Sequence, residues 1–226
     1  MASARVRPAG IEDLGLTRAE FRVLARLNTP QKIQDYLSAI PQNFEIGGET
    51  CLSVREVLRQ RRAHCIEGAM LAACALWMQG EPPLLLDLKA ERDYDHVVAL
   101  FRRDGCWGAI SKTNGLALRW RDPVYRSLRE LSMSWFHEYY NKRARKTLRT
   151  YSVPYDLRRM APADWVTVED GAWDLVDNLI ALRHYRLFTP AQVRSLVRRD
   201  PFERRWSHLA QYRRPKPAAG PRKKAK

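Results

Sequence analysis

Cys65 stands where an apolar helix is expected to begin, in the stretch RRAHCIEGAMLAACALWMQG at residues 61–80. The residues after it form one apolar stripe at helical spacing, made of Ile66, Ala69, Met70, Ala73, Leu76 and Trp77. The first N–H groups of a helix lack intrahelical partners, and the helix dipole adds positive charge there. Both effects favour the thiolate, which is the nucleophilic form of cysteine. The position therefore predicts a nucleophile, whereas a cysteine packed in an apolar helix would otherwise be a small hydrophobe.

Acyl chemistry at a cysteine also requires a base. His96 is the best candidate, because it begins the predicted strand HVVALF and can face the N-terminus of the cysteine helix. His64 is adjacent to Cys65 in sequence. Neighbours at a helix start are expected to point in different directions, so His64 is given no catalytic role.

A predicted hairpin supplies a partner for His96. A loop over residues 102–105 would pair Phe101 with Cys106 and bring Ser111 opposite His96. A tighter loop at residues 104–105 would instead bring Thr113 opposite His96. Ser111 and Thr113 lie on the same strand face, so either register places a hydroxyl beside the imidazole.

The sequence resembles the transglutaminase-like branch of the papain-like cysteine hydrolases. The resemblance lies in a cysteine on a helix, a histidine on a strand and a third residue on the next strand. The resemblance runs from about residue 27 to residue 114. It is carried by AHCIEGAMLAACALWMQGEPPLLLDL and by DYDHVVALFRRDGCWGAI. It implies that Cys65 is the nucleophile and that His96 is the general base.

The same resemblance implies an aspartate at the position that Ser111 occupies. A carboxylate holds the imidazole tautomer and stabilises the imidazolium, whereas a serine hydroxyl brings no charge. We expect Ser111 to orient His96 with a weaker thiolate–imidazolium pair as the result. Asn114 is an alternative partner if a bulge turns it inward, while Asp87 and Asp95 lie on the wrong strand faces.

The remaining candidates are assigned structural roles. Cys51, Cys74 and Cys106 are expected to be structural, and His184, in a stretch expected to be helical, is given no role. The cysteines show no metal-ligand spacing and no dense disulfide framework. The sequence therefore predicts neither a metal centre nor a cofactor.

The composition is that of a globular protein, with 45% hydrophobic and 29% charged residues. No stretch approaches the length of a membrane span, and the N-terminal residues have no apolar run of the secretory type. We therefore expect no membrane span and a cytoplasmic protein with reduced thiols.

The net charge of +15 is concentrated in the second half of the chain. Residues 1–115 hold 15 Lys/Arg against 14 Asp/Glu, and residues 116–226 hold 25 against 11. The segment KRARKTLR at residues 142–149 is one basic cluster, and residues 213–226 are predicted to be a basic disordered tail. Such charge suits nucleic acid or another polyanion, or simply a solvated face.

The order of elements predicts an α+β fold with a papain-like, transglutaminase-like core, in which the cysteine helix packs on a small antiparallel sheet. Capping boxes at Thr17–Glu20 and Ser53–Glu56 begin two earlier helices, and strands are expected at 84–88, 96–101 and 106–111. A long helix is expected from about Tyr125. We expect one domain over residues 1–212, with its core at about 27–114 and a helical extension at about 115–212.

Two functions follow. The first is a cysteine enzyme that transfers or hydrolyses acyl groups of a peptide or another amide-bearing substrate through Cys65, His96 and Ser111. The oxyanion would accept hydrogen bonds from the Cys65 backbone N–H and from a side chain in the turn at 47–53. The alternative is a catalytically inactive scaffold whose basic C-terminal half binds nucleic acid or another polyanion.

Overall fold

A seven-stranded antiparallel sheet forms the centre of the computed structural model, which describes residues 5–206 and 209–215. The strands follow the order β4-β3-β2-β1-β5-β7, and β6 pairs with β1 outside this path. Their bounds are β1 Leu84–Ala90, β2 His96–Arg103, β3 Cys106–Ile110, β4 Arg121–Tyr125, β5 Leu148–Ser152, β6 Tyr155–Asp156 and β7 His184–Arg186. The fold is thus mixed α and β, as the sequence predicts.

The helices begin at residues that cap them. Thr17, Thr29, Ser53, Ser127 and Thr189 each accept a hydrogen bond from a first-turn N–H with their side-chain oxygen. The α-helices are α1 Ile11–Leu14, α2 Arg18–Arg26, α3 Pro30–Ala39, α4 Val54–Gln60, α5 Cys65–Met78, α6 Leu128–Met133, α7 Trp173–Ala181, α8 Pro190–Ser195 and α9 Pro201–Trp206. Two short 3₁₀ turns lie at Leu157–Arg159 and Pro162–Asp164.

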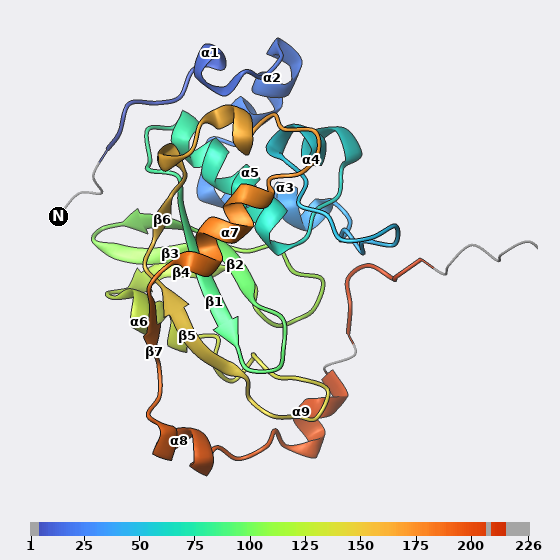
Figure 1. Cartoon of the computed structure of the whole chain (residues 1–226), viewed down its shortest axis with the longest axis vertical. Coiled ribbons are helices and arrows are strands. Elements are labelled where there is room, and N and C mark those ends of the chain that lie inside the picture. Colours follow the sequence, from blue (N-terminus) through green and yellow to red (C-terminus); the bar gives the residue numbers. More distant parts are fainter. Residues whose placement is uncertain (1–4, 207–208, 216–226) are drawn as a thin grey trace, which may run out of the picture.

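Helix α5 lies at the centre of the helical layer, between the sheet and the N-terminal helices (Figure 1). Every residue from Ile66 to Trp77 is buried, so the helix is covered on all sides rather than along one stripe. Its small residues permit close approach by neighbouring elements. Because α5 begins at Cys65, its N-terminus carries the predicted nucleophile.

Two cores occupy the two faces of the sheet. On β2, Val97, Ala99 and Phe101 join the core beneath α5, whereas Val98 and Leu100 join a second core on the opposite face. The second core contains Trp135 and Tyr139, which follow α6. Alternation along β2 therefore ties both halves of the chain to one sheet.

The second half departs most from expectation. The helix predicted from Tyr125 is limited to α6, and the region predicted as a helical extension also contributes β4, β5, β6 and β7. Leu131, Trp135 and Tyr139 are each four residues apart, but they come from α6 and the turns after it, which bury these side chains without a long helix. The sheet is consequently larger than the small sheet predicted.

Two further observations concern the ends of the chain and its apolar segments. Residues 213–215 lie outside any helix or strand, and the rest of the predicted tail, 216–226, lies outside the described residues. None of the helices in the described part of the chain has both the length and the hydropathy of a membrane span.

Candidate active site

Cys65 and His96 line the same pocket, which has a volume of about 540 Å³. Cys65 is half-buried at the first position of α5, and His96 is the first residue of β2. His64 and Tyr139 also line the pocket, and Ser111 lies behind His96. The structure therefore brings together the three residues that the sequence singled out.

A chain of two hydrogen bonds fixes the tautomer of His96. Its Nε2 lies 2.8 Å from the Ser111 hydroxyl oxygen, and that hydroxyl donates to the carbonyl oxygen of Leu118. A hydroxyl has one proton, so Ser111 accepts from His96 and Nε2 carries the hydrogen. Nδ1 is then the ring nitrogen available to accept a proton from Cys65, and the interaction with His96 lowers the pKa of that thiol.

The hairpin adopts the tighter of the two predicted registers. Arg103 pairs with Cys106, and the loop consists of Asp104 and Gly105, both with positive φ, at 49° and 81°. The prediction of a four-residue loop over residues 102–105 is therefore wrong. Strand β3 ends at Ile110, so Ser111 reaches His96 from just beyond the paired region.

Neither alternative partner contacts His96 in the described structure. The Thr113 hydroxyl accepts from the backbone N–H of Gly115 at 3.3 Å. The Asn114 amide donates to the carbonyl of Tyr212 at 3.0 Å and accepts from its N–H at 2.8 Å. Asn114 thus anchors the C-terminal segment instead of orienting the histidine.

The two histidines next to Cys65 determine its ionisation. Burial raises the pKa of the Cys65 thiol, but hydrogen bonds and charge interactions with His64 and His96 outweigh burial and hold the pKa well below its usual range. Burial without such partners has the opposite result at two other thiols. It raises the pKa of Cys51 to about 12 and also raises that of Cys74. Among these three cysteines, Cys65 alone has a lowered pKa.

His64 is the functional residue that the sequence reasoning missed. Its Nε2 lies 2.9 Å from the Thr50 carbonyl oxygen and 3.2 Å from Glu67 Oε1. Burial lowers the pKa of His64, but the side-chain contacts with Cys65 and Glu67 prevail and raise it to about 11. His64 is therefore a cation at neutral pH, with a thiolate on one side and a carboxylate on the other.

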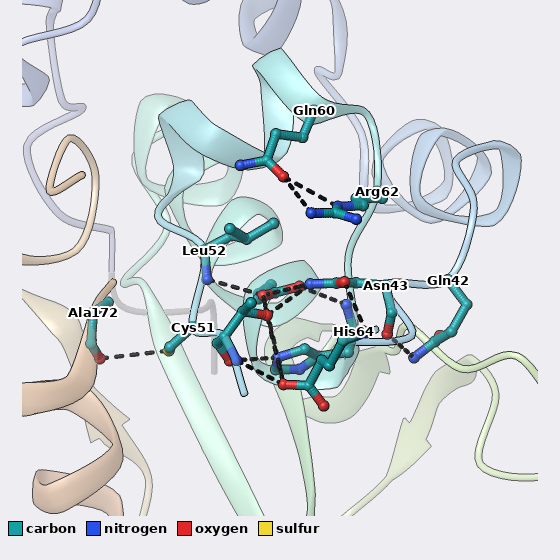
Figure 2. A network of polar contacts seen from close by, with 11 residues as sticks. Gln42, Asn43, Cys51, Leu52, Gln60, Arg62, His64 and Ala172 are labelled. Atoms are coloured by element: carbon teal, nitrogen blue, oxygen red, sulfur yellow. Dashed lines mark hydrogen bonds and ion pairs between the residues drawn. The ribbon is translucent and has the colours of Figure 1, made fainter. Parts of the chain in front are cut away.

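Glu67 is a fully buried carboxylate. Three of the residues that donate to it, Asn43, Leu52 and His64, are labelled in Figure 2. Glu67 accepts from the backbone N–H of Leu52 at 2.9 Å and of His64 at 2.7 Å, and from the side chains of Asn43 at 3.0 Å and Thr50 at 2.9 Å. Burial raises the pKa of Glu67, but the side-chain hydrogen bond and charge of His64, together with the backbone N–H groups of Leu52 and His64, lower it overall. The negative charge expected beside His96 is thus present beside His64 instead.

Segment 41–43 runs next to the start of α5. The backbone N–H of Asn43 donates to the Ala63 carbonyl at 3.0 Å, and Gln42 pairs with Ala63 in a parallel bridge. Figure 2 shows Gln42 beside Asn43 and His64. Gln42 lines the Cys65 pocket, and its buried Oε1 has no hydrogen-bond partner among the described residues.

Lys112 and Gly68 hold the loop that carries Ser111. The buried Lys112 amine donates to the carbonyls of Leu37 at 2.9 Å and Ile40 at 2.6 Å, at the C-terminal end of α3. Burial and the nearby Arg119 lower the pKa of Lys112 to about 8. A Cβ on Gly68 would lie 2.5 Å from the Lys112 Cβ. Only glycine therefore permits α5 to lie this close to the loop.

The loop before His96 is also fixed. The hydroxyl of Tyr139 donates to the Tyr94 carbonyl, and Asp95 Oδ1 accepts from the Ala90 N–H at 2.9 Å. These bonds close the connection between β1 and β2 directly ahead of His96. They hold the histidine by its backbone while Ser111 holds its ring.

A scan of known family models finds no match to this chain, and a search of curated proteins finds none either. The transglutaminase-like resemblance stays a prediction, and the function is inferred from the geometry of the pocket.

Proposed function

We propose that the chain is a cysteine-dependent acyl-transfer enzyme of the transglutaminase-like, papain-like class, acting on peptide or other amide bonds. One observation carries the proposal. Cys65 is a half-buried cysteine at a helix N-terminus, in a pocket of about 540 Å³ that His64 and His96 also line. The position of His96 on a strand beside the cysteine helix, with Ser111 following the next strand, supports the class.

In the acylation step, the Cys65 thiolate attacks the carbonyl carbon, a C–S bond forms and the carbonyl electron pair moves to oxygen. His96 Nδ1, which carries the proton taken from the thiol, gives it to the leaving amine as the C–N bond breaks. The Ser111 hydroxyl keeps the ring in place by accepting from Nε2–H at 2.8 Å.

In the deacylation step, His96 Nδ1 takes a proton from water or from an acceptor amine, which attacks the thioester carbon. The C–S bond breaks and the thiolate is regenerated. His64 stabilises this thiolate as a fixed cation, and Glu67 holds His64 in place. His64 retains its proton at neutral pH, so it acts by charge and His96 does the proton transfer.

The negative oxygen of the intermediate requires hydrogen-bond donors. Cys65 is the first residue of α5, so its backbone N–H lacks an intrahelical partner. The side-chain amide of Gln42, whose Nε2 makes a 3.3 Å contact with the Asn43 carbonyl, is the neighbouring donor that supports the proposal. It precedes the turn at 47–53 that the sequence suggested.

Acylation by an activated ester tests the proposal. The full chain is incubated with p-nitrophenyl acetate, and acetylation of each cysteine is mapped by mass spectrometry. We expect acetyl-Cys65 with release of p-nitrophenolate, lost in Cys65→Ala and slowed in His96→Ala. Cys106 is the matched control, because it is also half-buried but does not line the pocket. Equal labelling of Cys65 and Cys106, or no labelling of Cys65, would overturn the proposal and favour a catalytically inactive scaffold.

A further inference from the structure

A larger hollow adjoins the Cys65 pocket, and Asp93 and Tyr94 line both. Its volume is about 1000 Å³. Three segments meet around it, namely the loop between β1 and β2, residues 141–149, and residues 193–198 on and after α8. An extended molecule bound at Cys65 can therefore continue past Tyr94 into the second hollow, which we call the basic hollow.

Cations dominate the wall of the basic hollow. Six of them are exposed and have neither an ion pair nor a side-chain hydrogen bond within the described residues, namely Arg92, Lys142, Arg143, Arg145, Arg194 and Arg198. The two acids are already engaged, because Glu91 pairs with Arg149 at 2.8 Å and Asp93 accepts from the Thr147 hydroxyl at 2.7 Å. Eight Lys and Arg residues against two acids leave the wall with an excess of positive charge, which attracts an anion.

The lining favours carboxylates over nucleic-acid bases. Among the described residues that line the hollow, Tyr94 is the single aromatic side chain, and Val193, Leu196 and Val197 supply the apolar surface. Single-stranded nucleic acid is commonly bound by successive aromatic rings that stack on its bases. Guanidinium groups bind carboxylates in a paired, planar geometry. The adjoining pocket is suited to amide bonds, which a peptide contains throughout.

We infer that the basic hollow binds an acidic segment of a peptide or protein substrate, next to the amide that reacts at Cys65. This inference rests on the proposed function, and it assigns the class of substrate. The acidic side chains would extend from the Cys65 pocket past the exposed Tyr94, whose relative exposure is 91%.

Binding to the Cys65→Ala protein tests the inference independently of catalysis. Fluorescence anisotropy is measured with a labelled oligoglutamate, a Gly-Ser peptide of the same length, and an oligothymidylate. One variant reverses charge in the hollow, with Lys142→Glu, Arg143→Glu and Arg194→Glu. Its control reverses the same number of charges on exposed α2, with Arg18→Glu, Arg22→Glu and Arg26→Glu. Figure 1 shows α2 at the opposite end of the molecule from α8.

We expect oligoglutamate to bind more tightly than the other two probes and to weaken as salt is added. The hollow variant should lose about tenfold in affinity, from three exposed charge contacts of modest strength, and the α2 variant should retain it. Preference for the oligothymidylate, no binding of oligoglutamate, or equal losses in the two variants would overturn the inference. Because Cys65 is absent, a failure here leaves the acetylation test of the proposed function unaffected.

Discussion

The chain contains two buried histidine–carboxylate pairs that behave in opposite ways. His64 Nε2 lies 3.2 Å from Glu67 at the start of α5, and His184 Nε2 lies 3.0 Å from Asp87 between β7 and β1. Both carboxylates are almost completely buried. The pKa of Glu67 is nevertheless lowered, whereas burial raises that of Asp87 to about 6 against the opposing bond from His184.

The difference lies in the number of donors around each carboxylate. Glu67 accepts from two backbone N–H groups and from the side chains of Asn43, Thr50 and His64, which offset the cost of burying its charge. The hydrogen bond that lowers the pKa of Asp87 comes from His184 alone. At similar burial, the carboxylate with more hydrogen-bond donors has the lower pKa. Glu67 is therefore the carboxylate that can stabilise a histidine cation beside a thiol.

The largest expected effect comes from Glu67→Gln. The amide nitrogen of glutamine cannot accept, so buried donors lose a partner and His64 loses the charge of its nearest carboxylate. We expect the free energy of unfolding at pH 7 to fall by about 3–5 kcal/mol, measured with urea. Folding lowers the pKa of Glu67, so its ionised form contributes to the free energy of unfolding at pH values above its ordinary pKa. This contribution is lost as pH falls through the pKa of the folded state. A loss at pH 7 no larger than that of Asp87→Asn would contradict the comparison.

Gly68→Ala should have the next largest effect on stability. Helix propensity alone favours alanine by roughly 0.5–1 kcal/mol, so a stabilised protein would indicate free space at this position. The Lys112 Cβ lies 2.5 Å from the added methyl group, and we expect a net loss of about 1–3 kcal/mol instead. Thermal unfolding distinguishes the two signs. Gly47→Ala, which meets no atom within 4 Å, is the control and should change stability little.

Ser111→Ala should have a smaller effect, confined to the active site. It leaves the Nε2–H of His96 and the Leu118 carbonyl without the hydroxyl between them. We expect the rate of Cys65 alkylation at pH values below the folded pKa of Cys65 to fall about fivefold, the equivalent of one hydrogen bond of roughly 1 kcal/mol. Thr113→Ala removes a hydroxyl bonded to Gly115, not to His96, and should leave the rate unchanged. Equal effects of the two substitutions would remove Ser111 from its orienting role.

Asp87→Asn should have the smallest effect at pH 7, within about 1 kcal/mol, because it replaces a carboxylate whose burial is poorly compensated. Folding raises the pKa of Asp87, so between about pH 4 and 6 the folded state binds more protons than the unfolded state. The contribution of Asp87 to the free energy of unfolding therefore falls as pH rises through this range. Denaturation of both proteins across this range should show that the free energy of unfolding of the native chain, minus that of Asp87→Asn, falls as pH rises. A difference that rises with pH would mean that Asp87 is stabilised as an anion.

Much of the site was predictable because its components are local. The caps at Thr17 and Ser53, the start of α5 at Cys65 and the hairpin after His96 each depend on a few consecutive residues. The alternation of strand faces placed the hydroxyls of Ser111 and Thr113 on the same side as His96, but the observed register alone would pair His96 with Thr113. Ser111 reaches His96 because it lies just beyond the end of β3.

The rest depended on contacts between distant segments. The role of His64 follows from Glu67, whose donors Asn43 and Thr50 precede it by 24 and 17 residues. The spacing of His64 and Glu67 at a helix start was a sign of their contact, but it does not reveal the other donors. Strands β4 to β7 are two to five residues long and lack a clear alternation, and β7 contains His184, which the sequence assigned to a helical stretch.

The pH dependence of Cys65 alkylation tests the central claim most directly. The native chain, His64→Ala and His96→Ala are treated with iodoacetamide at a series of pH values, and labelling of each cysteine is followed by mass spectrometry. We predict that native Cys65 reacts at its full rate at pH values below the ordinary thiol pKa, that either substitution shifts its profile to higher pH, and that Cys51 and Cys74 stay unreactive. A Cys65 profile centred near the ordinary thiol pKa of about 8.5, the same in all three proteins, would contradict the account.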